Sequence, residues 1–108
     1  MKGMGGMQQM LKQANQLQRK MEKLQAELAE RTYTATAGGN GVTITVKGES
    51  TIQNIEVNED LIKEGDLEMI VDLIKLASNE ALKNAKEENS KEMSKLTGGL
   101  GGMLGGLV

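Results

Sequence analysis

The 108-residue chain contains no cysteine and no histidine. Without cysteine it can form neither disulfides nor thiolate zinc sites. Without histidine it lacks the commonest metal ligand of proteins and the commonest general base. Acyl transfer by a Ser-His or Cys-His pair is therefore excluded, while a carboxylate pair remains formally possible because 15 acidic residues are present. We expect a non-enzymatic protein with no cofactor, no metal and no small-molecule substrate.

Aromatic residues are almost absent as well. Tyr33 is the single one, and there is no phenylalanine or tryptophan. The core must therefore be aliphatic and rich in methionine, and a chain of this length builds one domain with a modest core. Because such a core leaves apolar surface to be covered, we expect a homodimer.

Long hydrophobic runs are also missing. No stretch approaches the roughly 20 apolar residues that cross a bilayer. Residues 1–11 lack the continuous apolar run of a signal peptide. We therefore expect a cytoplasmic protein without a membrane partner.

The first third of the chain has apolar residues at alternating spacings of three and four, which marks one face of a helix. We predict a helix over residues 7–31, about 37 Å long. It would project from the core as an arm, and a second long helix would have to cover its apolar row. The row consists of Met7, Met10, Ala14, Leu17, Met21, Leu24 and Leu28.

A second long helix is predicted over residues 66–96, with its first residue, an aspartate, as the N-cap. Met93 and Leu96 near its end are placed for antiparallel contact with Met7 and Met10. One face of this helix is apolar, and we expect it to be buried. That face comprises Leu67, Ile70, Val71, Ile74, Ala77, Ala81, Leu82 and Ala85.

Between the helices the pattern changes to that of β-strands. Residues 31–37 are rich in β-branched side chains, and residues 42–47 alternate apolar with polar ones. Residues 38–41, Gly-Gly-Asn-Gly, accept the positive φ of a hairpin turn. A phosphate-binding loop would instead lie between a strand and a helix, so we predict a hairpin.

A third strand is predicted over residues 51–57. Its alternation slips by one residue near Gln53, which indicates a β-bulge or bend. Asn58 is then placed to cap a short helix over residues 59–64, and Gly65 ends that helix. The short connections between the strands favour an antiparallel meander.

The predicted fold class is α+β: a long N-terminal helix, a three-stranded antiparallel meander, a short helix and a long C-terminal helix. Residues 98–108 contain too much glycine for a stable helix. We expect this segment to be a flexible tail rich in Gly, Leu and Met.

Charge is unevenly distributed along the chain, although the net charge is only -2. Residues 1–25 contain five basic residues and one glutamate, whereas residues 49–72 contain eight acidic residues and one lysine. Lys12, Arg19 and Lys23 recur at intervals of seven and four, so they share one face of the arm helix. This face suits a polyanion, although composition alone favours an ordinary solvated helix surface.

Taken in order, these segments resemble the YbaB/EbfC family of small bacterial nucleoid-associated proteins over nearly the whole chain. Their order and spacing are more specific than any one segment. The tail departs from the family pattern because it has no proline near the closing glycines. The matching segments are residues 10–14, Leu17, Gln18, Met21, 38–42, 46–48, 52–57, 77–81 and 93–100.

The resemblance implies a tweezer-like homodimer, in which coiled-coil helical arms rise from a joined β core and grip duplex DNA. It also implies a bacterial cytoplasmic protein of the nucleoid that binds DNA largely independently of sequence and influences gene expression. Residues 1–97 would form the single YbaB/EbfC-like domain, followed by the tail at 98–108. The expected phosphate contacts are Lys12, Arg19, Lys20 and Lys23, with Lys2, Lys91 and Lys95 as candidates near the far end of the arm.

A second hypothesis is a prefoldin-like or scaffold protein that grips other proteins through Met- and Leu-rich helical arms. Prefoldin-like chains lack the short helix and third strand predicted here. Salt separates the two hypotheses, because counterions weaken DNA binding steeply and do not weaken apolar capture.

Overall fold

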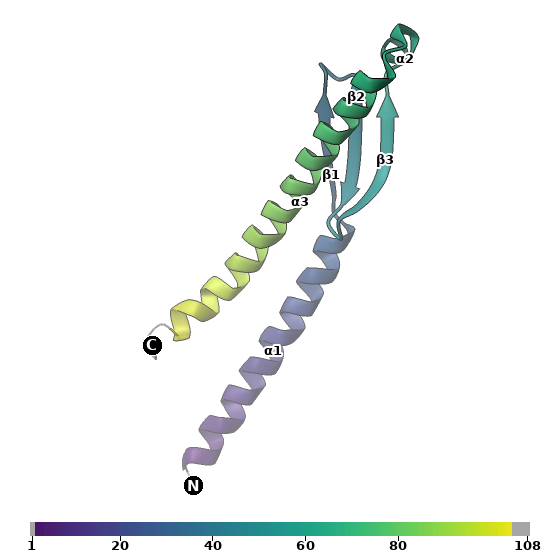
Figure 1. The fold of residues 1–108 in the computed structure, drawn as a ribbon. Coiled ribbons are helices and arrows are strands. Elements are labelled where there is room, and N and C mark those ends of the chain that lie inside the picture. The colour runs from purple at the N-terminus through teal and green to yellow at the C-terminus, as the bar shows by residue number, and fades with distance from the viewer. Residues whose placement is uncertain (1, 105–108) are drawn as a thin grey trace.

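The computed structural model describes the backbone of residues 2–104 and the side chains of residues 6–98. Along the chain, a long helix comes first, a three-stranded sheet and a short helix follow, and a second long helix comes last (Figure 1). The fold is elongated, measuring 78 × 23 × 15 Å, and its radius of gyration of 21.4 Å far exceeds the ~13 Å of a compact 100-residue domain. The elements are α1 (Lys2–Glu30), β1 (Thr32–Ala37), β2 (Val42–Lys47), β3 (Thr51–Val57), α2 (Glu59–Glu64) and α3 (Leu67–Leu104).

The three strands form the predicted antiparallel meander in the order β1-β2-β3. The turn between β1 and β2 has φ of 65° at Gly38, 60° at Gly39 and 70° at Asn40, and the Gly41 N–H donates to the Gly38 carbonyl at 3.1 Å. Gly-Gly-Asn is suited to this turn because these residues tolerate left-handed backbone. The predicted hairpin is therefore confirmed.

The predicted bulge in β3 is also confirmed. Thr45 of β2 pairs with Asn54, and the next residue, Val46, pairs with Ile52, so Gln53 is the extra residue. Because of this insertion, Ile52 and Ile55 point to the same face of the sheet as their partners on β2, although they are three positions apart.

The core lies between β2 and α3. Val42, Ile44 and Val46 are fully buried, and α3 packs on β1 and β2 while barely touching β3 (Figure 1). Three alanines, each one turn after the last, allow the helix backbone to approach the sheet closely. These are Ala77, Ala81 and Ala85, all at most 1% exposed.

Both predicted helix caps are present. The Asn58 side chain accepts from the Asp60 N–H at 2.9 Å, and Asp66 Oδ1 accepts from the Met69 N–H at 3.0 Å. Gly65 ends α2 in the left-handed conformation, with φ of 75°. Each cap supplies an acceptor to a backbone N–H that has no partner within its helix.

Both long helices are longer than predicted. α1 begins at Lys2, and the expected end of the last helix at about Leu96 is wrong, since α3 continues to Leu104. Each glycine costs about 1 kcal/mol relative to alanine, but extending an existing helix adds a backbone hydrogen bond per residue and needs no new nucleus. Residues 105–108 of the predicted tail lie outside the described residues.

The prediction that the whole apolar face of α3 is buried is wrong at two positions. Leu67 is 74% and Val71 57% exposed. Both lie in the first two turns of α3, and their helical phases are close to those of buried Ala85 and Ser78. Their position along the helix, and not the side of the helix they occupy, therefore separates them from the buried residues.

The predicted cover of the arm is only partly present. Leu28, beside the sheet, is 3% exposed, whereas Met7 and Met10 are both 65% exposed. The contact of these two methionines with Met93 and Leu96 is therefore wrong. α1 and α3 extend from the sheet in nearly the same direction, and the N-terminal end of α1 extends past the end of α3 (Figure 1).

Candidate nucleic-acid interface

The basic side chains of α1 lie on the face opposite the one that joins it to the sheet. At about 100° per residue, Lys12, Arg19 and Lys23 fall within about 40° of one another and point away from buried Leu28. Lys20 lies about 80° to one side. All four side chains are exposed, so the shared face predicted from spacing is present.

These four side chains have no ion-pair partner among residues 6–98. The ion pairs there join Lys47 to Glu30 and Lys95 to Glu92. The α1 cations are consequently available to an external anion. Lys12 and Lys23 are about 16 Å apart along the helix axis, which matches about five phosphates of one DNA strand at 3.4 Å each.

The other candidates are placed differently. Lys91 is exposed on α3, and Lys95 Nζ lies 3.6 Å from Glu92 Oε1. Because an exposed ion pair of this kind contributes about 0–1 kcal/mol, a phosphate could displace the glutamate. The side chain of Lys2 lies outside the described residues. Neither Lys91 nor Lys95 extends the basic face of α1, because both are on the other helix.

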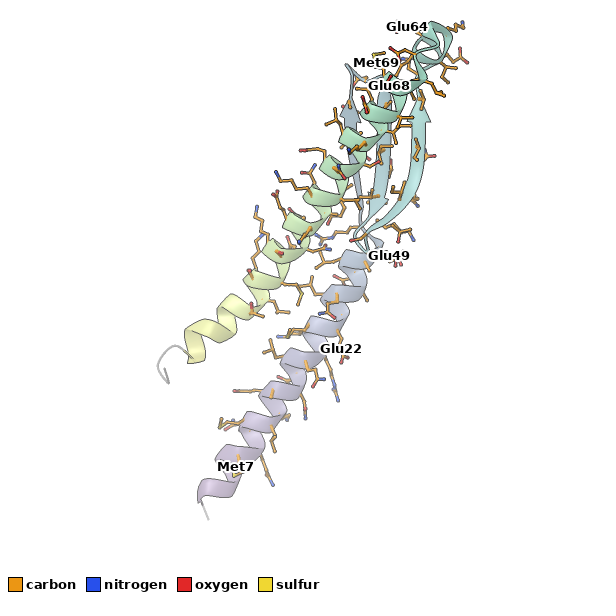
Figure 2. All side chains as sticks on the ribbon, in the orientation of Figure 1. Met7, Glu22, Glu49, Glu64, Glu68 and Met69 are labelled. Atoms are coloured by element: carbon orange, nitrogen blue, oxygen red, sulfur yellow. The ribbon has the colours of Figure 1, made fainter. Side chains whose placement is uncertain are left out.

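Acidic residues gather at the opposite end of the molecule. Figure 2 shows Glu64 and Glu68 at the end formed by α2 and the start of α3, while Met7 marks the far end of α1. This end carries most of the eight acidic residues of 49–72. A polyanion is repelled there and attracted to the arm, so the long axis of the molecule is also an axis of charge.

A second surface was missed by sequence reasoning. Ile52 and Ile55 of β3 are 43% and 46% exposed, although they pair with buried Val46 and Ile44. They lie on the face of the sheet that α3 only partly covers. We call Ile52, Ile55, Leu67 and Val71 the open apolar surface. No local pattern signalled this exposure, because the apolar spacing of these residues is also that of residues that are buried.

Within the described residues, no helix is long and apolar enough to cross a membrane. In residues 6–98, no charged side chain is buried, and no three acidic groups come together as metal ligands. The features with chemical consequences in the described residues are a cationic helix face and an apolar surface.

The chain belongs to the YbaB/EbfC DNA-binding family, whose model matches residues 4–100. The resemblance inferred from the sequence is thereby confirmed. This chain is 48% identical over 100 residues to a nucleoid-associated protein of Clostridium acetobutylicum, and the match covers 91% of this chain and 89% of that protein. A nucleoid-associated protein of Clostridium novyi is 46% identical over 101 residues, with the same shares covered.

A solved structure shares the fold. It is an uncharacterized protein of Helicobacter pylori, with a TM-score of 0.70 and 15% sequence identity over 82% of this chain and 92% of that one. The predicted α+β architecture is therefore confirmed both by the elements of this chain and by a known fold.

Proposed function

We propose that this protein binds duplex DNA largely independently of sequence, without catalysis, and that the basic face of α1 contacts the phosphates. The observation that carries the proposal is the alignment of Lys12, Arg19 and Lys23 on one exposed face, free of ion pairs within residues 6–98. Lysine and arginine on one helix face meet the phosphate backbone and report no base. Membership of a DNA-binding family supports DNA as the polyanion.

We further propose that two copies associate through the open apolar surface. β3 is an edge strand, so its outer backbone groups are unpaired within the sheet, and such edges are normally covered. Its isoleucines are exposed, as are Leu67 and Val71 of α3. A second copy supplies the same apolar side chains, as a two-fold interface requires. The dimer would then present two basic arms to one duplex.

The proposed location is the nucleoid in the bacterial cytoplasm. Support comes from the relatives in two Clostridium species, which are named nucleoid-associated proteins. A protein that binds many sites by phosphate contact covers DNA in proportion to its concentration. By that route it would organise the nucleoid and influence gene expression.

The capture of other proteins by apolar arms is not favoured. Met7, Met10 and Leu11 at the arm end are indeed exposed, which such a function would need. The family match, however, is to DNA-binding proteins, and apolar capture gives no reason for the aligned cations on the other side of the helix.

Fluorescence anisotropy with two unrelated duplexes of equal length tests the proposal, at about 50 and 200 mM salt. We expect similar affinity for both duplexes and a loss of about 10³-fold or more between these salt concentrations if six or more phosphates are contacted. A preference for one duplex would contradict sequence independence. An absence of binding at the lower salt would overturn DNA as the partner.

The interface is tested by reversing charge. Lys12→Glu, Arg19→Glu and Lys23→Glu together should abolish binding at about 50 mM salt, because the face then repels phosphate. The matched control changes net charge equally on residues away from α1, as Lys63→Glu, Lys83→Glu and Lys86→Glu. If the control weakens binding as much as the arm variant, net charge rather than the α1 face determines affinity.

A further inference from the structure

The place where α1 meets the sheet is held by contacts from three elements. We call it the arm joint, made of Leu28, Gly48 and Asn89 with the backbone around them. The Gly48 N–H donates to the Arg31 carbonyl at 2.8 Å, and the Glu49 N–H donates to the Ala29 carbonyl at 3.3 Å. Two backbone bonds therefore tie the β2–β3 turn to the end of α1.

Gly48 is at the centre of the joint and is itself buried. A Cβ built on it would collide with the carbonyl oxygen of Leu28. Any side chain at position 48 would therefore push α1 away from the sheet. The glycine is needed here for close approach, because its φ is not in the left-handed region.

Asn89 connects α3 to this joint. Its Nδ2 donates to the Gly48 carbonyl at 2.9 Å, in a half-buried position 41 residues away in sequence. Among the described side chains, this is the one hydrogen bond that joins α3 to the β2–β3 turn. Its Oδ1 is buried and accepts no hydrogen bond within residues 6–98. Of the two polar atoms of the Asn89 amide, only Nδ2 therefore forms a hydrogen bond within residues 6–98.

Small movements at the joint become large movements along the arm. Lys12 is about 24 Å from Leu28 along the helix axis, so a rotation of about 10° at the joint moves it by about 4 Å. That displacement equals the outer limit of an ion pair, so the side chain would no longer reach its phosphate. Residues 6–16 of the arm are all exposed, whereas Leu17 and Met21 are half-buried. The N-terminal part of the arm, which includes Lys12, is therefore the part that other elements restrain least.

We propose that Asn89 is a positioning residue that sets the direction of α1 relative to α3 through its bond to Gly48, and thereby sets how many arm cations reach DNA phosphates. The effect on DNA rests on the proposed function; the effect on arm direction does not. Asn89 itself touches no DNA in this proposal. Its role is to hold the β2–β3 turn, which in turn holds the end of α1.

The test replaces the amide without removing its volume. Asn89→Leu has about the same size and cannot donate. It removes the unpaired Oδ1 but leaves the Gly48 carbonyl without its donor, so we expect a modest loss of stability in a protein that remains folded. The matched control is Asn79→Ala, an exposed asparagine of the same helix. Thermal unfolding of each variant verifies that the sheet and α3 remain folded.

Arm direction is followed by double electron–electron resonance, which measures the distance between spin labels on two introduced cysteines. These are Gln8→Cys on α1 and Ser94→Cys on α3. The chain has no native cysteine to interfere, and an excess of unlabelled protein limits the distances to one subunit. We expect Asn89→Leu to shift or broaden the distance by about 3 Å or more, and the control to match the parent. A distribution identical to the parent would overturn the proposal.

DNA binding by the unlabelled variants provides the second measurement. We expect Asn89→Leu to bind about fivefold more weakly and to lower the salt slope by about 1 for each phosphate that the arm no longer reaches. If Asn89 contributed to stability alone, the dependence of DNA affinity on salt concentration would be the same in the folded variant as in the parent. A shifted arm with unchanged affinity and slope would overturn the link to DNA. If the parent protein itself did not bind DNA, the proposed function would be wrong. The label distances would still test whether Asn89 sets the direction of α1.

Discussion

At the scale of single residues, the centre of the fold depends on β2. Ile44 is 0% exposed and pairs with Ala35 on one side and Ile55 on the other. The alanines of α3 that cover this strand contribute little volume of their own. The large side chains of β2 therefore account for much of the buried area of a core that has no phenylalanine or tryptophan.

We expect Ile44→Ala to lower the free energy of unfolding by about 2–5 kcal/mol, because the neighbouring alanines cannot fill the cavity. Urea denaturation measures this directly. Thr43→Ala, on the other face of the same strand, should cost much less. A loss below about 1 kcal/mol for Ile44→Ala would show that α3 and the sheet can close around the gap.

At the scale of elements, helix ends were determined by local chemistry and could be predicted. Asn58, Gly65 and Asp66 act as the sequence indicated, since a cap needs only one side chain and the backbone two or three residues away. The position of the bulge followed from the same kind of local signal. The end of α3 at Leu104 could not be predicted in this way. Glycine content indicates a low intrinsic helix propensity, but it does not indicate whether a preceding helix can extend into the segment.

Removal of the α3 cap by Asp66→Ala should cost about 1 kcal/mol of unfolding free energy, since the Met69 N–H loses its acceptor. Asp72→Ala is the control, as an exposed aspartate within the same helix. Thermal or urea unfolding of both variants measures the difference. Equal effects would mean that charge, and not capping, accounts for the loss.

At the scale of the whole molecule, one chain is incomplete in two ways. Its arm leaves Met7 and Met10 exposed, and its sheet leaves Ile52 and Ile55 uncovered at the edge. With a 78 Å long axis and a thin core, the chain offers apolar surface that a second copy can bury. In the proposed function, the acidic residues at the end formed by α2 and the start of α3 (Figure 2) would repel the bound DNA.

Ile55→Glu should convert a dimer to a monomer, because it places a charge in the centre of the open apolar surface. Sedimentation velocity measures the change in mass. Asn54→Glu, on the opposite face of the same strand, is the matched control. We expect the monomer to show about half the salt slope of the parent in DNA binding, since one arm is removed. A dimer that survives Ile55→Glu would place the interface elsewhere.

The sequence by itself determined the elements, their order, the hairpin, the bulge, the caps and the alignment of Lys12, Arg19 and Lys23, because each depends on residues close together in the chain. Tertiary structure decided which part of each apolar stripe is covered. α3 lies over β1 and β2, so Ile52 and Ile55 of β3 remain exposed, and Leu67 and Val71 in the first two turns of α3 are exposed as well. It also decided the arm joint, since the bond from Asn89 to Gly48 spans 41 residues and no local pattern announces a contact between elements so far apart.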